Sequence, residues 1–156
     1  REVKPESFSR QIAFNVIPQI DVFQDNDYTK EEMKMVWETQ KIMGDQSILV
    51  NATAVRVPVF YGHAEALHLE TSSPIDAQHV KELLADAPGV TVYDGNEQFP
   101  TQVSSASGND IVHVGRIRND ISHPCGLNLW VVSDNIRKGA ATNSIQIAET
   151  LIRDYL

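Results

Sequence analysis

Hydrophobic and charged positions recur at helical spacing between residues 30 and 43. The apolar members of this stretch fall on one face at about 100° per residue, and they are Met33, Val36, Trp37 and Met43. Thr29 and Glu32 stand three positions apart at its start, which is the pattern of a capping box. Gly44 follows its end, as is typical of a helix C-terminus. The pattern predicts an amphipathic helix that ends at about Met43.

Shorter apolar stretches rich in β-branched residues predict strands or extended chain. These stretches are residues 14–23, 48–60, 63–70, 90–93, 111–118 and 127–132. Pro58 places the second of them near a sheet edge or a bulge, because proline cannot donate to a ladder. The segment 94–110 is loop-like, and its most flexible-looking part is 104–109.

Two further stretches have helical spacing. Residues 76–87 end at a Pro-Gly pair, and a second stretch runs from residue 133 or 134 to the C-terminus. The apolar side of the second stretch is predicted to be buried, and its members are Ile136, Ala140, Ile147 and Leu151. Short joins between strands, such as 60–63, favour antiparallel pairing. Together, these helices and strands predict an α+β fold with a mostly antiparallel or mixed sheet and helices on one face.

Composition narrows the class of protein. The chain has 156 residues, 42% hydrophobic and 22% charged, which is the size and composition of one globular domain. Its net charge of −8 argues against a general nucleic-acid or anionic-membrane binder, since both need a positive face. No apolar run of about 18 residues and no secretory leader occurs, and we expect a cytoplasmic location. The sequence has no G-x-G-x-x-G motif and no P-loop.

The charged residues on one face of the first predicted helix allow two interpretations. Glu31 and Lys34 are three residues apart and therefore side by side. They could form an ordinary surface pair, which is the more common case. They could also form a cradle for a zwitterion, with Glu31 facing an ammonium group and Lys34 a phosphate.

Three other side chains could take part in chemistry. Arg56 interrupts a run of valines, either on the solvent face of a sheet or as a fork that grips a carboxylate through two hydrogen bonds. His63 follows Gly62 and is either a structural histidine or a general acid/base. Cys125 is the single cysteine, so it cannot form an internal disulfide, and we interpret it as a small side chain near a strand start.

Several segments taken together resemble aspartate-semialdehyde dehydrogenase of the branch found in many bacteria. They are Phe14–Asp21, Tyr28–Ile42, Ala52–Val59, Gly62-His63, Val114–Arg118 and Leu129–Ala141. The resemblance spans essentially the whole chain but covers only the second part of that family. It implies the carboxy-terminal fold of the glyceraldehyde-3-phosphate-dehydrogenase type, with residues 1–156 as a catalytic and dimerisation domain.

The resemblance also implies an activity. The family uses NADPH to convert L-aspartyl 4-phosphate to L-aspartate 4-semialdehyde, with release of phosphate, on the route to lysine, threonine, methionine and diaminopimelate. Carried over by position, Arg56 would hold the substrate carboxylate, Glu31 its ammonium group and Lys34 the phosphate. His63 would be the general acid/base, and Asn135 would lie near the nicotinamide carboxamide. The family forms homodimers through the sheet of this domain.

The part of the family that lies outside the resemblance carries the Rossmann domain that binds NADP, the nucleophilic cysteine and the glutamine that assists it. We therefore expect this chain alone to be inactive and to bind NADPH poorly. Two alternatives stay open: a non-catalytic paralogue that serves in dimerisation, and a related acyl-phosphate reductase that acts on N-acetylglutamyl phosphate.

Overall fold

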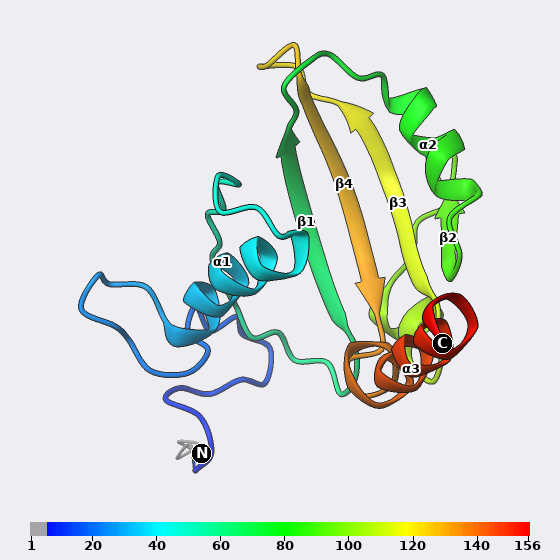
Figure 1. Ribbon diagram of the computed structural model, residues 1–156. Helices are drawn as coiled ribbons and strands as arrows, with labels where there is room; N and C mark the ends of the chain where they lie inside the picture. The colour runs from blue at the N-terminus through cyan, green and yellow to red at the C-terminus, as the bar shows by residue number, and fades with distance from the viewer. Residues whose placement is uncertain (1–5) are drawn as a thin grey trace. The chain divides into compact units, whose positions relative to one another are not determined.

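The computed structural model describes residues 6–156, and the chain divides into two units. Unit 1 is Arg1–Pro58 and unit 2 is Val59–Leu156. Unit 1 contains helix α1 (Lys30–Met43), and unit 2 contains a four-stranded sheet with the other helices. Figure 1 shows the elements with their labels.

Helix α1 confirms the first sequence prediction at both ends. The Thr29 hydroxyl accepts a hydrogen bond from the Glu32 N–H at 3.3 Å, and the Glu32 carboxylate accepts one from the Thr29 N–H at 2.7 Å. The helix ends where Gly44 adopts a left-handed conformation, with φ of 66°. The capping box therefore sets the start of the helix, and glycine supplies the turn that ends it.

The predicted strand over 48–60 is wrong, because a single residue of it pairs. Arg56 forms an isolated antiparallel bridge with Ile17. On one side of the bridge, Pro58 has no N–H to donate to a ladder. On the other side, the Ala54 N–H donates to the Glu32 carboxylate at 2.8 Å and is not free for a strand. The segment 14–23 is extended chain, as predicted, with single bridges at Ile17 and Phe23.

The sheet of unit 2 has the strand order β1-β4-β3-β2. Its strands are β1 (His63–Glu70), β2 (Val90–Tyr93), β3 (Val112–Asn119) and β4 (Gly126–Ser133). Strand β4 pairs antiparallel with β1 and β3, whereas β2 pairs parallel with β3. The sheet is therefore mixed, which confirms the predicted α+β class, and the four strand predictions hold to within one residue at each end.

Helix α2 (Ala77–Ala85) covers one face of the sheet, and Asp76 caps it by accepting from the Gln78 N–H. The core lies between this helix and the strands. Its buried members are Ala77, Val114, Ile117, Leu127 and Leu129, with Leu67, Val80, Leu84 and Val131 packed against them. Side chains alternate along a strand, so the neighbouring residues of β4, such as Trp130, face the opposite side.

That opposite side carries the loop 94–111. The Trp130 indole N–H donates to the Pro100 carbonyl at 3.0 Å. Residues Gln102–Ala106 form a π-helical turn, η1, capped by Thr101, and Ala106 is fully buried. The prediction of an irregular loop is therefore confirmed on either side of η1 but wrong for η1 itself.

The predicted C-terminal helix begins later than expected. Strand β4 continues to Ser133, a second π-helical turn, η2, spans Arg137–Ala141, and helix α3 spans Thr142–Tyr155. The Asp134 carboxylate accepts from the Ile136 and Arg137 N–H groups, both at 2.9 Å, and these bonds hold the irregular connection.

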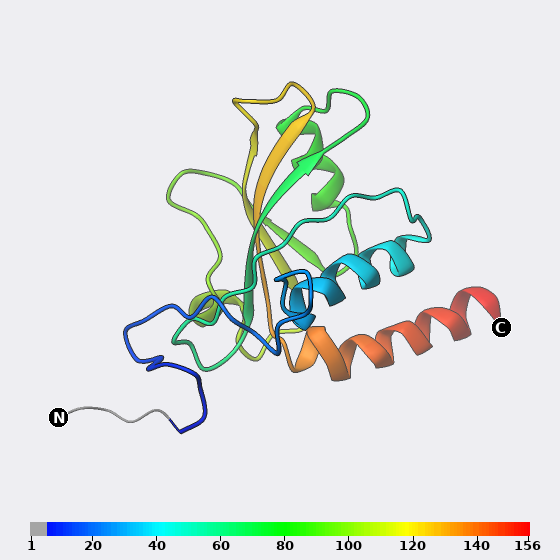
Figure 2. The same ribbon diagram turned by 90° about the vertical axis from the view of Figure 1, so that its left-hand side faces the viewer.

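The predicted burial of the apolar side of this helix is also wrong. Ile136, Ile147 and Leu151 are at least half exposed, because α3 runs away from the sheet of its unit (Figure 2). In the part of the chain that the structure describes, no helix combines the length and apolar character needed to cross a bilayer.

Candidate functional site

The five residues singled out from the sequence are distributed over both units. Unit 1 contains Glu31 and Lys34 on α1 and Arg56 on the chain that pairs with Ile17. Unit 2 contains His63 at the start of β1 and Asn135 just after β4. Each unit carries its own group of candidate side chains.

Glu31 and Lys34 form an ion pair, with Lys34 Nζ 3.3 Å from Glu31 Oε2. The pKa of Lys34 is raised, first because Glu31 accepts its hydrogen bond and then because Glu31, Glu38 and Asp21 add negative charge around it. Lys34 therefore stays cationic at neutral pH. Both side chains are partly exposed, so the pair presents a cation and an anion side by side.

Arg56 is held in place by its own backbone. Its N–H donates to the Ile17 carbonyl at 2.8 Å, and its carbonyl accepts from the Ile17 N–H at 3.0 Å. The guanidinium lies over the Phe8 ring, 5.4 Å from the ring centroid, in cation–π geometry. A hollow of about 130 Å³ opens beside it, lined by Ser7, Phe8, Ser9, Ile17, Gln19, Asp21 and Arg56. This hollow has the polarity of a site for a small charged group.

Asp21 was not singled out from the sequence, although it lies next to two of the predicted residues. It lines the hollow with Arg56, and its charge contributes to the raised pKa of Lys34. Its backbone is left-handed, with φ of 67°, and its carboxylate accepts from the Val22 N–H at 2.8 Å. Asp tolerates a left-handed backbone by its residue type, but the position of Asp21 beside Arg56 depends on the bridge to Ile17.

His63 begins β1 and pairs in register with Ser133, the last residue of β4. The preceding residue, Gly62, is held by Asn135, whose side-chain oxygen accepts from the Gly62 N–H at 2.9 Å. The two residues that the sequence singled out in unit 2 therefore meet at one end of the sheet. Asn135 positions the turn from which His63 enters the strand.

Gly62 is required at this turn for two reasons. Its φ of +87° is a conformation that side chains with a Cβ rarely adopt. A Cβ at this position would also lie 3.3 Å from the Gln102 side chain and from the Ser133 carbonyl. Gln102 in turn donates to the Gly62 carbonyl at 3.4 Å. The close approach fixes the direction in which His63 leaves the turn.

The segment that carries Asn135 is fixed by a second set of hydrogen bonds, which Asp134 accepts. Asp134 is buried and accepts from the Gly108 N–H at 2.8 Å. Backbone hydrogen bonds from Arg137, Gly108 and Ile136 lower the pKa of Asp134, so it is ionised at neutral pH. The network joins the chain after β4 to the loop at 108 and so holds Asn135 in place.

Arg137 forms a second tie between the same two segments. Its guanidinium donates twice to Asp110, at 2.7 and 2.6 Å. The hydrogen bond from Arg137 is the largest cause that lowers the pKa of Asp110 to about 2. The loop at 108–110 and the segment 134–137, which contains Asn135, are therefore linked by a buried carboxylate, Asp134, and a partly exposed one, Asp110.

Cys125 directly precedes β4, as expected for a small side chain near a strand start. Its thiol is free, and its N–H donates to His123 at 3.3 Å. Across residues 6–156, no group of three or more His, Cys, Asp or Glu side chains is arranged to hold a metal ion. Nothing in this arrangement assigns Cys125 a role in the candidate site.

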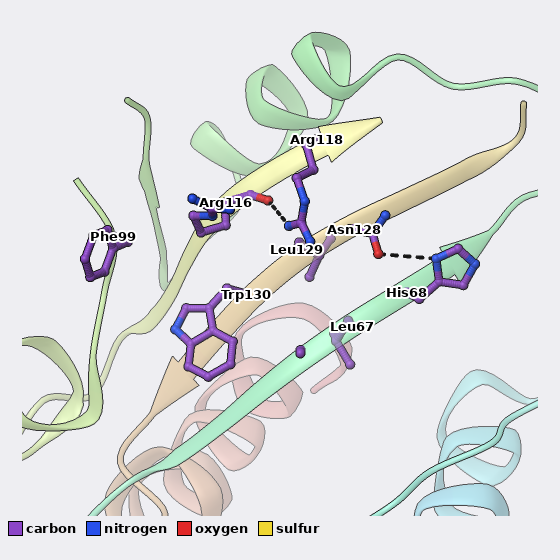
Figure 3. A pocket seen from close by; sticks show the side chains of 9 residues that line it. Leu67, His68, Phe99, Arg116, Arg118, Asn128, Leu129 and Trp130 are labelled. Atoms are coloured by element: carbon purple, nitrogen blue, oxygen red, sulfur yellow. Dashed lines mark hydrogen bonds between the residues drawn. The ribbon is translucent and has the colours of Figure 1, made fainter. Parts of the chain in front are cut away.

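A larger hollow, of about 400 Å³, lies on the sheet face opposite α2 (Figure 3). Its lining combines aromatic, basic and amide side chains with apolar ones, and includes Phe99, Arg116, Arg118, Asn128, Trp130 and His68. Arg118 donates to the Arg116 carbonyl at 2.8 Å where the register between β3 and β4 shifts. The surface is rich in Trp and Arg, the residue types that are enriched in protein interfaces.

Comparison with known proteins places this geometry in a family. Residues 1–138 match the family described as semialdehyde dehydrogenase, dimerisation domain. An aspartate-semialdehyde dehydrogenase from a Shewanella strain is 66% identical over 153 residues, which are 98% of this chain and 45% of the relative. The chain therefore spans less than half the length of that relative.

Solved structures agree with the sequence comparison. Aspartate semialdehyde dehydrogenase II from Vibrio cholerae, complexed with ASA, has a TM-score of 0.93 and 65% identity; the match covers 98% of this chain and 45% of that one. An aspartate semialdehyde dehydrogenase from Candida albicans with NADP has a TM-score of 0.69 and 28% identity, and the match covers 90% of this chain and 45% of that one. This chain belongs to the semialdehyde dehydrogenase dimerisation-domain family.

Proposed function

We propose that this chain is the substrate-binding and dimerisation part of an aspartate-semialdehyde dehydrogenase. In this reaction L-aspartyl 4-phosphate, NADPH and a proton yield L-aspartate 4-semialdehyde, NADP and phosphate. The observation that carries the proposal is the 65% identity and common fold with a protein whose structure was solved with ASA. The reaction supplies lysine, threonine, methionine and diaminopimelate synthesis, and we propose that it takes place in the cytoplasm.

The substrate is a zwitterion with an acyl phosphate, and unit 1 offers one group for each charge. Arg56 holds the α-carboxylate through two parallel hydrogen bonds, a geometry that a planar guanidinium provides and an ammonium group does not. Glu31 accepts from the α-ammonium group. Lys34, kept cationic by its raised pKa, binds the phosphate.

His63 serves as the general acid/base in unit 2. A histidine suits this task because its ordinary pKa lies near neutral pH, so it can both take and return a proton. The turn at Gly62 and the pairing with Ser133 fix the backbone that carries its side chain. The nucleophile that attacks the acyl phosphate comes from outside these 156 residues.

NADP supplies the hydride in this reaction, and we propose that the remainder of the enzyme, as a Rossmann domain, binds most of it. Within this chain, Asn135 has the chemistry to contact the nicotinamide carboxamide. Its oxygen is used by the Gly62 N–H, which leaves the side-chain NH₂ as a donor. An amide donor matches the carbonyl of the carboxamide.

The test is the substrate preference of the full-length enzyme. We expect NADP reduction with aspartate semialdehyde and phosphate, and much slower reduction with N-acetylglutamate semialdehyde. The acetylated substrate has no free ammonium group for Glu31 to bind. Preference for it would contradict the proposal in favour of an N-acetylglutamyl-phosphate reductase, and no turnover of either would favour a non-catalytic paralogue.

A second expectation concerns the chain alone. The 156-residue chain lacks the proposed nucleophile and the nucleotide-binding domain, so it should not reduce NADP with semialdehyde and phosphate. The same assay on the isolated chain measures this directly. Activity of the isolated chain would mean that a residue within it, and not one outside, attacks the substrate.

We further propose that the enzyme is a homodimer and that the face around Trp130 forms the contact. Trp and Arg are enriched at the centres of interfaces, and this face combines Trp130 and Phe99 with Arg116 and Arg118. Ala66 lies opposite Trp130 in the β1–β4 register and is exposed. Replacement of Ala66 by glutamate places a charge in the proposed contact.

Analytical ultracentrifugation of the full-length enzyme tests this contact. Ala66→Glu should shift the enzyme from dimer to monomer at micromolar concentration. The matched control is Glu82→Ala on the exposed side of α2, which should leave the dimer intact. If Ala66→Glu remains a dimer, the interface lies on another surface of the protein.

A further inference from the structure

Both carboxylate oxygens of Glu32 accept hydrogen bonds, and the two donors are backbone N–H groups of different segments. Oε2 accepts from the Thr29 N–H at 2.7 Å and closes the capping box of α1. Oε1 accepts from the Ala54 N–H at 2.8 Å, two residues before Arg56. The side chain is 7% exposed. One buried carboxylate therefore ties the helix that carries Glu31 and Lys34 to the segment that carries Arg56.

The tie closes a frame of three segments in unit 1. The Lys30 N–H donates to the Val22 carbonyl at 2.8 Å, which joins the helix start to the segment that carries Asp21. That segment joins the third one through the paired backbones of Ile17 and Arg56. Glu32 supplies a side-chain link between the helix and the third segment. The Gln40 side chain of α1 also donates to the Ile48 carbonyl at 3.0 Å, and the Tyr28 hydroxyl donates to Asn51 at 2.9 Å. Of these links, the one from Glu32 to Ala54 lies nearest to Arg56 along the chain.

We infer that Glu32 is a positioning residue that sets the spacing between Arg56 and the Glu31–Lys34 pair, an inference that rests on the function proposed above. A substrate that bridges these groups is held at both ends. A change in their separation therefore weakens substrate binding even when each group is intact.

The charge of Glu32 is needed for this role. Hydrogen bonds from the Thr29 and Ala54 backbones lower its pKa, so it is ionised at neutral pH and accepts at both oxygens. Glutamine has the same length but one acceptor oxygen, and its NH₂ group would face a backbone N–H. Glu32→Gln therefore leaves one of the two buried N–H groups without its acceptor.

The experiment compares steady-state kinetics of full-length variants. Glu32→Gln should raise the KM for aspartate semialdehyde about tenfold, and should leave the KM for NADP within about twofold. The NADP value is an internal control, since a general loosening of the protein would move both constants. An equal rise in the two constants would overturn the inference, and so would an unchanged KM for the semialdehyde.

Two control variants separate positioning from helix stability and from charge. Thr29→Ala removes the hydroxyl that caps α1 but keeps the tie from Glu32 to Ala54. Asp25→Asn removes a charge of the same sign from an exposed position of the same unit. Both should leave the semialdehyde KM within about twofold of wild type. A rise in either control as large as that of Glu32→Gln would overturn the inference.

Glu32→Asp covers the case in which Glu32→Gln does not fold. Aspartate keeps the charge but is one methylene shorter, so it cannot reach both N–H groups, and its semialdehyde KM should also rise. A wild-type KM in Glu32→Asp would overturn the inference. If the wild-type enzyme does not turn over the semialdehyde, the proposed function fails and the inference fails with it. If it does and the variants match it, the inference alone fails.

Discussion

The two units hold their candidate residues by different means. In unit 2, His63 is the first residue of a strand whose eight residues all pair with β4, and this sheet packs on a core with α2. In unit 1, Arg56 is fixed by one isolated bridge, and α1 by a capping box and a carboxylate that reaches Ala54. In unit 2, many backbone hydrogen bonds of the β1–β4 ladder hold the strand that carries His63. In unit 1, Arg56 and α1 are held by individual contacts.

The difference predicts how the candidate residues of each unit respond to substitution. A substitution in the sheet should lower stability before it disturbs His63, because neighbouring pairs keep the register. A substitution at a single tie in unit 1 should disturb substrate binding at a small cost in stability. The variants below separate these two outcomes.

The largest effect is expected for His63, the proposed general acid/base in unit 2. His63→Gln in the full-length enzyme should lower kcat by about 10²–10⁴-fold, the usual contribution of proton transfer. The pH–rate profile should lose the limb that reports the histidine. Stability should change little, because the side chain is exposed at the end of β1.

His79→Gln is the matched control, because His79 is an exposed histidine of the same unit on α2. Its kcat and pH profile should equal those of wild type. A His63→Gln enzyme with the wild-type pH profile would remove His63 from the mechanism.

The next effect concerns the core that supports β4. Leu127 is 2% exposed, and Leu127→Ala should lower the free energy of unfolding by about 2–5 kcal/mol. Leu69 is its partner in the β1–β4 register but is 43% exposed, so Leu69→Ala should cost clearly less. Urea denaturation with the same probe measures both. Equal losses would mean that the edge strand is as well packed as the centre of the sheet.

The strands of the sheet could be predicted from the sequence because they are short apolar stretches rich in β-branched residues. Periodicity also located α1 and α2, since apolar spacing and caps are local signals. The strand predicted over 48–60 failed for a reason that is not local. The Ala54 N–H is used by a carboxylate 22 positions earlier in the chain, and no pattern around residue 54 reveals that.

The candidate site shows the same limit. Residue types and the family resemblance singled out Arg56, His63 and the Glu31–Lys34 pair. Asp21 was missed because its place beside Arg56 follows from the bridge between Ile17 and Arg56, which joins segments 39 residues apart. Glu32 was interpreted as a helix cap, and its second oxygen was visible only in three dimensions. Local patterns therefore predict the elements, and long-range contacts assemble the site.

In unit 1, replacement of Arg56, the proposed carboxylate-binding residue, should affect catalysis and not stability. Arg56→Lys keeps the positive charge and the backbone bridge to Ile17 but loses the two parallel donors. Hydrogen bonds to charged groups contribute about 1.5–3 kcal/mol, so kcat/KM for the semialdehyde should fall about 10- to 100-fold.

Arg10→Lys is the matched control, since Arg10 is an exposed arginine of the same unit. It should retain wild-type kinetics. Wild-type kcat/KM in Arg56→Lys would show that another group binds the carboxylate. A large loss of stability in Arg56→Lys would show that the cation–π contact with Phe8 is structural.

The smallest effect is expected for the ion pair between Arg137 and Asp110, which joins the segment that contains Asn135 to the loop at 110. Arg137 lowers the pKa of Asp110 from 3.8 to about 2, so the folded state favours the ionised carboxylate. A lowered pKa adds stability above the unfolded value, and this contribution is lost as pH falls through 3.8 toward 2. Asp110→Asn should therefore be slightly less stable than wild type at pH 7, and the two should converge in acid.

Urea midpoints measured from pH 7 to pH 2 test this, with Asp25→Asn, an exposed turn residue of unit 1, as the control. The control removes a carboxylate elsewhere in the protein, so a pH dependence shared by both variants would not report on the Asp110–Arg137 pair. A difference between Asp110→Asn and wild type that persists at pH 2 would mean that shape, and not charge, links the two segments. If Asp110→Asn instead matches wild type at every pH, the ion pair with Arg137 adds no measurable stability. The buried Asp134, which accepts from the Gly108, Ile136 and Arg137 N–H groups, would then be the main tie at this end of the sheet.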